Sequence, residues 1–298
     1  MNRSARIRLA LAVSVTLVFL VLFLRGVHWG GVWEALLDVR FGWLLLAIAL
    51  SVCDYFMRAV RWIFLVRHVD RNVSLDTLWR GTAIGSALNT FMPFRGGDLV
   101  RPAYVASKRG MPFTTLLSTT VVERLLDLFG FVTSLLVMLV MIPPSMLQSA
   151  VSVGQLRRWG AVGAVAVVGG LALMAFLATR RAREAVMLIV RPWPYPVRMR
   201  VMRFYLQLSY GLEAGGHPLR LLPAAFATLV TWTFTAALAW ASFRALGVQA
   251  GPALGVFVAV AMTAAIAVPQ APGFLGLFQV ATEQAALLWG VSQGQAEA

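Results

Sequence analysis

The sequence TFMPFRGGDLVR, residues 90–101, interrupts a chain that is otherwise mostly apolar. It combines one proline, two adjacent glycines, two arginines and one aspartate. Proline and paired glycines end helices and form turns, and a charged side chain within a bilayer is costly unless it faces protein or water. The segments on either side of this break therefore decide the fold.

The composition around the break is that of a membrane protein. Of the 298 residues, 59% are hydrophobic and 13% are charged, whereas about a quarter of the residues in a soluble domain are charged. Since roughly 20 apolar residues cross the hydrocarbon core, we predict an all-α polytopic membrane protein. It is expected to be a helical bundle of five or six spans in one integral domain, residues 1–298. The apolar stretches place spans at about 7–24, 41–66, 112–142, 159–178 and 219–244.

The net charge of +14 follows the positive-inside rule, and this distribution argues against nucleic acid as a partner. Arginines precede the first apolar stretch and follow the second; seven more occur in residues 180–203, with Glu184 as the one acidic residue. We expect a cytoplasmic N-terminus and a cytoplasmic amphipathic segment at about 180–215 with affinity for anionic headgroups. A chain rich in arginine and alanine with a single lysine is typical of a GC-rich bacterium, so the predicted location is the bacterial inner membrane.

The segment that precedes the break is too short to be a membrane span. Residues 81–94 are uncharged, but fourteen residues at a rise of about 1.5 Å reach only about 21 Å, and the hydrocarbon core is about 30 Å thick. A short helix, a Pro/Gly break and a second helix together predict a re-entrant hairpin at about residues 77–109. Its tip should face a cavity lined by protein or water.

A second interrupted segment lies at about residues 252–290. PQAPG, residues 269–273, separates a stretch of small residues from an apolar one, so Pro and Gly stand four apart, as do Pro93 and Gly97. Paired broken helices mark the binding site in many transporters. Two interpretations stay open, an inverted repeat and two unrelated breaks. The residues singled out in this second hairpin are Pro269, Pro272, Gly273, Gly276, Gln279 and Glu283.

The first break has the residues of an anion site. Gly96 and Gly97 let the backbone approach a ligand closely, the following helix start offers free N–H groups, and Arg95 and Arg101 match phosphate geometry. Asp98 is a candidate to cap the helix, orient Arg101 or contact a cationic part of a headgroup. We predict that these five residues bind a lipid headgroup. The alternative is a simple turn at the cytoplasmic interface.

A charge network is expected beside this site. Glu123, Arg124 and Asp127 occur within a helix that should enter the membrane, and Arg58 and Arg61 lie on one helical face of an earlier span. Ionisable groups in such places are expensive and usually paired. The network is interpreted either as internal ion pairs that fix helix positions or as a proton relay or headgroup contact.

Several enzyme motifs are missing from the sequence. The three histidines lack metal-ligand spacing, and there is neither a nucleophile elbow nor a phosphate-binding glycine loop. We predict a protein that is not an enzyme and that holds no metal or cofactor. An intramembrane transferase that uses Glu123 or Asp127 stays open.

Together these motifs resemble the flippase-like transmembrane region of lysylphosphatidylglycerol synthase, over most of the chain from about Arg58-x-x-Arg61-Trp62 onward. PFRGGDLVR resembles the family's Pro-x-Arg-x-Gly-Glu-x-x-Arg, VVERLLD its V-x-E-R-x-x-D, and PGFLGLFQ its Pro-Gly-Gly-x-Gly-x-x-Glu. Asp98 and Gln279 replace glutamates, and Phe274 replaces a glycine. Relatives tend to continue with a further helix, so we expect either a C-terminally truncated chain or a short member.

The resemblance implies a stand-alone flippase or lipid transporter without the synthase domain. We expect it to bind and translocate an anionic phospholipid or a polyisoprenoid-linked lipid by its headgroup. Its partners would be membrane lipids, with a homo-oligomer or a lipid-biosynthesis protein as further candidates. The alternatives are an intramembrane lipid or sugar transferase and a non-catalytic member of a lipid-synthesis complex.

Overall fold

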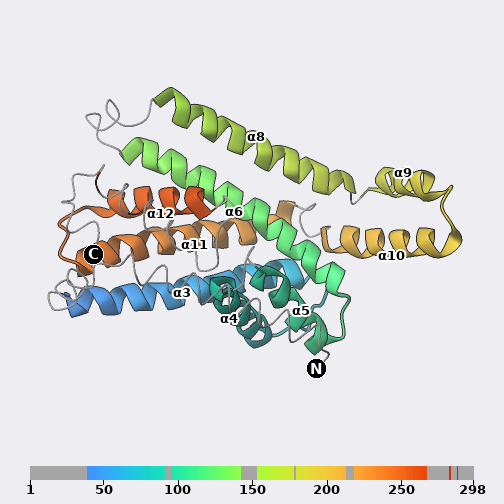
Figure 1. The fold of residues 1–298 in the computed structure, drawn as a ribbon, viewed down its shortest axis with the longest axis horizontal. Helices are drawn as coiled ribbons and strands as arrows, with labels where there is room; N and C mark the ends of the chain where they lie inside the picture. Colours follow the sequence, from blue (N-terminus) through green and yellow to red (C-terminus); the bar gives the residue numbers. More distant parts are fainter. Residues whose placement is uncertain are drawn as a thin grey trace, which may run out of the picture. The chain divides into compact units, whose positions relative to one another are not determined.

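A computed structural model describes residues 39–91, 96–141, 153–177, 179–212 and 218–266, together with residues 282 and 287. All regular structure in these residues is helical, with no strand, which confirms the predicted all-α class. Figure 1 labels the helices, which are α3 (Phe41–Val66), α4 (Leu75–Phe91), α5 (Gly97–Arg109), α6 (Phe113–Met141), α8 (Val153–Leu177), α9 (Arg180–Val190), α10 (Tyr195–Leu212), α11 (Pro218–Ala245) and α12 (Pro252–Ile266).

Three helices among the described residues are long and apolar enough to cross a membrane, Phe41–Val66, Phe113–Met141 and Leu221–Ala245. They coincide with three of the predicted spans and confirm them as long apolar helices. The span predicted at 159–178 falls in α8, where the apolar stretch is the shorter Ala161–Gly170. The span predicted at 7–24 lies outside the described residues.

The first predicted hairpin corresponds to α4 and α5. α4 ends at Phe91 and α5 begins at Gly97, so the helical break falls within the quoted dodecamer. α4 has 17 residues, fewer than the roughly 20 that a span requires. Of the second hairpin, α12 is described, whereas the PQAPG break lies outside the described residues. The re-entrant course of both segments stays a prediction.

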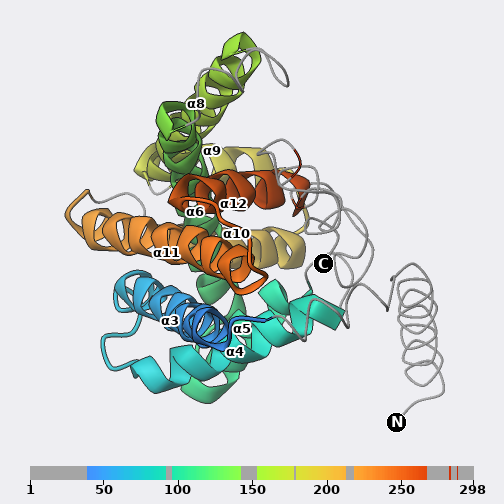
Figure 2. The ribbon, with the colours of Figure 1, turned by 90° about the vertical axis from the view of Figure 1, so that its left-hand side faces the viewer.

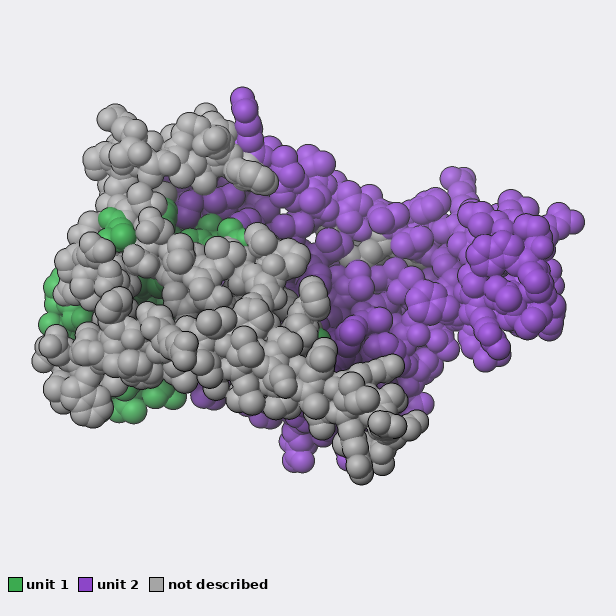
Figure 3. All heavy atoms as spheres, viewed as in Figure 1, with its two compact units in different colours: residues 1–49, 86–97, 236–298 green, residues 50–85, 98–235 purple. Residues whose placement is uncertain are grey.

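The chain forms two compact units, coloured in Figure 3. Unit 1 comprises residues 1–49, 86–97 and 236–298, and unit 2 comprises residues 50–85 and 98–235. The helices α3, α4 and α11 each contribute residues to both units, and α5 contributes its first residue, Gly97, to unit 1. The five residues of the predicted charge network all belong to unit 2.

Unit 2 has a core in which α6 is the central helix. α6 packs against α8 and α10 (Figures 1 and 2), and fully buried side chains from other helices join its own, among them Trp62, Leu78 and Val105. Small residues allow close helix approach. A Cβ on Gly170 of α8 would meet the end of the Leu125 side chain of α6, so the two helices lie close together at this contact.

Unit 1, in its described part, is held together by α12 and the end of α11. Phe243, Val248, Leu254 and Val258 form its apolar core. The Trp240 indole donates a hydrogen bond of 2.8 Å to the Ala250 carbonyl. This bond fixes the connection between the two helices.

The amphipathic segment predicted at about 180–215 contains two helices, α9 and α10. Thr179 caps α9, because its hydroxyl accepts a hydrogen bond from the Ala182 amide. α10 does not lie wholly on a surface, since Tyr205, Ser209 and Leu212 are buried. Its second half therefore belongs to the core of unit 2.

Candidate functional site

The helix α5 begins at the paired glycines of the quoted dodecamer. Gly96 is in the turn, Gly97 is buried, and Asp98 is in the first turn of the helix. An acidic residue in the first turn is stabilised by the positive end of the helix dipole. The Asp98 carboxylate also accepts a hydrogen bond of 2.8 Å from Arg124 of α6. Arg95 lies outside the described residues, so its predicted role stays a prediction.

Glu123 is the centre of the charge network. It is 1% exposed, and two guanidinium groups reach it from different helices. Arg61 of α3 donates to Oε1 over 3.3 Å and Arg101 of α5 donates to Oε1 over 3.2 Å, while Arg101 Nη1 is 2.9 Å from Oε2. One carboxylate thus links three helices within unit 2.

Asp127 lies one turn further along α6 and continues the network. It accepts hydrogen bonds from Arg61 of α3 and, over 3.1 Å, from Arg124 of its own helix. The i, i+4 spacing of Glu123 and Asp127 puts both carboxylates on one face of α6. Arg124 also binds Asp98, so these ion pairs connect α6 with the first turn of α5.

Arg101 is held by an aromatic ring as well as by a carboxylate. Its guanidinium carbon lies 3.8 Å from the centre of the Trp62 ring, a cation–π distance. The Trp62 indole in turn donates a hydrogen bond of 2.9 Å to Thr119 of α6. The sequence predicts Arg101 as a headgroup ligand, and the structure places this side chain inside the ion-pair network.

A second pair extends the network along α3. Arg58 binds Asp54 over 2.8 Å, and the Thr235 hydroxyl of α11 donates to the other Asp54 oxygen over 3.3 Å. Asp54 and Thr235 are absent from the predicted site. The helical spacing of Asp54 and Arg58 is visible in the sequence, whereas a single threonine in an apolar span gives no signal.

The network as a whole is electrically balanced. Four arginines face four carboxylates in the ion pairs above: Arg58, Arg61, Arg101 and Arg124 with Asp54, Asp98, Glu123 and Asp127. Pairing offsets much of the cost of keeping charges among apolar helices. Any anion that enters would therefore compete with a carboxylate for its arginine.

Two donors of the network are left over. The Nε atoms of Arg61 and Arg101 are buried and have no hydrogen-bond partner among the described residues. A buried donor without an acceptor costs about 1–3 kcal/mol. Both arginines bind Glu123, so the two unsatisfied donors belong to the centre of the network.

Other predicted features are not part of this described cluster. All six residues singled out in the second hairpin lie outside the described residues. In the part of the chain that the structure describes, no group of three histidine, cysteine or acidic side chains is arranged to hold a metal ion. Beyond the spans, Arg109 at the end of α5 donates a hydrogen bond of 2.7 Å to Asp70, and this bond lowers the pKa of the Asp70 carboxyl.

Comparison with known proteins identifies the family. The model of the lysylphosphatidylglycerol synthase transmembrane region matches residues 7–298. The UPF0104 membrane protein PH1989 of Pyrococcus horikoshii is 30% identical over 128 residues, so the match covers 42% of this chain and only 37% of that protein. No solved structure matches. As its motifs predict, the chain is a multi-pass membrane protein that belongs to the family of the lysylphosphatidylglycerol synthase transmembrane region.

Proposed function

We propose that this protein binds the anionic headgroup of a phospholipid or a polyisoprenoid-linked lipid and moves it between the leaflets of the bacterial inner membrane. The observation that supports this most is the network of buried Arg61, Arg101 and Glu123 with the half-buried Asp127, in a chain with helices apolar enough to span a bilayer. Ionisable groups inside a membrane usually serve binding or transport.

The two unsatisfied donors suggest how an anion is received. A phosphate has several acceptor oxygens and matches the planar guanidinium group. Entry of the headgroup would give the Nε atoms of Arg61 and Arg101 the acceptors that they lack. It would also loosen the Arg101–Glu123 pair, because phosphate and carboxylate compete for the same guanidinium.

Exchange of partners then provides a path through the protein. The headgroup moves from one arginine to the next while its acyl chains stay in the bilayer, and the ion pairs of Glu123 and Asp127 re-form behind it. Asp98, in the first turn of α5, belongs to the same network through Arg124.

A leaflet-resolved lipid assay in proteoliposomes tests this proposal. We expect Arg101→Ala and Glu123→Gln each to reduce translocation of a fluorescent phosphatidylglycerol by about tenfold or more, since a hydrogen bond to a charged group is worth about 1.5–3 kcal/mol. Arg80→Ala is the matched control, because it removes an arginine from an exposed pair with Asp76 on α4. Translocation by the control should equal that of the unmodified protein.

The variant Arg101→Lys distinguishes a loss of translocation from a loss of folding. It keeps the positive charge of the side chain but loses the planar guanidinium group. We expect this variant to fold, as judged by its thermal unfolding in detergent, and to translocate poorly. Full translocation by folded Arg101→Ala would contradict the proposal. A covalently altered lipid product would instead favour the transferase.

A further inference from the structure

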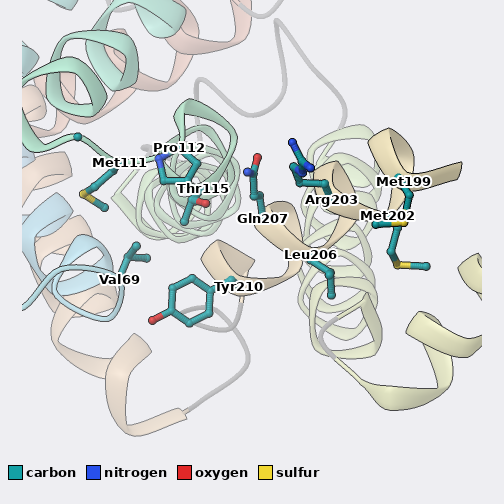
Figure 4. Close-up of a pocket in the computed structure, with 11 residues that line it drawn as sticks. Val69, Met111, Pro112, Thr115, Met199, Met202, Arg203, Leu206, Gln207 and Tyr210 are labelled. Atoms are coloured by element: carbon teal, nitrogen blue, oxygen red, sulfur yellow. The ribbon is translucent and has the colours of Figure 1, made fainter. Parts of the chain in front are cut away.

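A pocket of about 560 Å³ opens between α10 and the turn that joins α5 to α6, all within unit 2 (Figure 4). Ligand pockets commonly enclose about 300–1,000 Å³. Most of its lining is apolar, with Val69, Met111 and Pro112 on one side and Met199, Met202 and Leu206 of α10 on the other. None of these residues belongs to the ion-pair network.

The pocket lies where two apolar helices end. Val69 follows the last residue of α3, Val66, by three positions, and Met111 and Pro112 immediately precede α6, which begins at Phe113. Gly110 forms the turn there with φ of 66°, a conformation that glycine adopts readily. The ends of spans lie at the boundary between the hydrocarbon core and the headgroups, so the pocket is expected at headgroup depth.

Three polar side chains of α10 also line the pocket, Arg203, Gln207 and Tyr210. Arg203 and Gln207 are one helical turn apart on α10, and Figure 4 shows their side chains next to one another. Arg203 is exposed and its guanidinium forms no ion pair or hydrogen bond with the described residues. Tyr210, a further turn along, packs its ring 5.5 Å from that of His68. An unpaired cation with an amide beside it is suited to an anion.

Positive charge predominates around the pocket. The α9–α10 segment holds seven arginines and one glutamate in residues 180–203. Exposed apolar side chains accompany them on α10, among them Met199 and Phe204. A surface that is both basic and apolar binds anionic bilayers. Cations also follow α3 and end α5, at Arg67, Arg71 and Lys108, whereas Arg109 is paired with Asp70.

We propose that this pocket holds one anionic glycerophospholipid of the leaflet that faces the arginine-rich end of the protein. The phosphate binds Arg203 and Gln207, and the first part of one acyl chain lies along Met202 and Leu206. Such a bound lipid would join α10 to the α5–α6 turn. The site is separate from the translocation site proposed above and does not depend on it.

Native mass spectrometry of the full-length protein in detergent, titrated with phosphatidylglycerol, tests the proposal. We expect Arg203→Ala to weaken binding of the tightest lipid about tenfold, the loss of one charge-assisted hydrogen bond. Arg200→Ala is the matched control: it removes the same charge from an exposed position on α10 that does not line the pocket. Its affinity should be unchanged.

Two further measurements define the ligand. Leu206→Trp fills the apolar part of the pocket, so it should also prevent the lipid from binding. In competition experiments, phosphatidylcholine and glycerol 3-phosphate should not displace phosphatidylglycerol from the unmodified protein. Equal losses in Arg203→Ala and Arg200→Ala would mean only general surface attraction and would overturn the proposal. Equal binding of glycerol 3-phosphate would overturn it in favour of a soluble anion. Translocation measured on the same variants reports separately on the network site.

Discussion

Glu123 shows how a charged residue is kept among apolar helices. Its two oxygens are shared between Arg61 and Arg101, and Arg101 is stacked on Trp62. Each partner is itself expensive to bury, so the arrangement contributes little net stability while it is intact. Removing Glu123 is costly, because Arg101 then loses its carboxylate partner while Arg61 keeps only Asp127.

We therefore expect Glu123→Gln, which preserves the shape of the side chain, to lower the free energy of unfolding by about 3–5 kcal/mol. The measurement is thermal or denaturant unfolding in detergent. Asp76→Asn is the control, because Asp76 binds Arg80 on an exposed face and such pairs are worth about 0–1 kcal/mol. Similar stability of the two variants would show that Glu123 is not the centre of the network.

For single residues, the sequence predicts which charged side chains lie within spans better than it predicts which residues pair with them. Glu123, Asp127 and Arg61 stand out because charge is rare within spans. The sequence does not show which arginines pair with Glu123, and only the packing of α3, α5 and α6 selects Arg61 and Arg101. The neutral side chains that support them, Trp62 and Thr119, resemble any other core residue in the sequence.

The contact between α10 and α6 depends on a residue without a side chain. A Cβ on Gly211 would meet the Ser118 hydroxyl and the Thr115 carbonyl of α6. Ser118 already donates its hydroxyl to that carbonyl over 2.8 Å, so it cannot turn away without losing the bond. The second half of α10 can be buried only because its backbone approaches α6 closely.

Gly211→Ala should accordingly destabilise the protein by about 1–3 kcal/mol, the usual cost of overpacking. Gly169→Ala is the matched control within α8: apart from its own stretch of helix backbone, no described atom lies within 4 Å of the added Cβ, and alanine is favoured over glycine in a helix by up to about 1 kcal/mol. Unfolding in detergent measures both. A stabilising Gly211→Ala would contradict the close contact.

The sequence predicts the first and last residues of a helix well where the length of the apolar stretch alone determines them. The predicted span at 41–66 equals α3, and that at 112–142 differs from α6 by one residue at each end. α8 instead begins at Val153, six residues before the predicted 159. The predicted start lies after Arg157 and Arg158 because these charges end the apolar stretch, but a helix can continue through them. The burial of α10 was unpredictable, since its basic residues favour a surface position.

At the scale of the whole molecule, the arginines determine orientation. α3 runs from Phe41 to Val66 and is followed by Arg67 and Arg71. α11 begins at Pro218, after the arginine-rich α9 and α10, and ends at Ala245. Since positive residues stay in the cytoplasm, both helices should have their arginine-rich ends there. The proposed lipid pocket, which α10 lines, would then belong to the cytoplasmic leaflet.

Cysteine labelling in membrane vesicles tests this orientation. In a Cys53→Ser background, which removes the chain's one cysteine, Arg200→Cys reports on α10 and Gly251→Cys on the connection after α11; both positions are exposed. Because α11 separates them and is long enough to cross the bilayer, an impermeant maleimide should label position 200 only in inverted vesicles and position 251 only in right-side-out vesicles. The reverse pattern would place the arginines outside, and labelling of both positions from one side would mean that α11 does not cross.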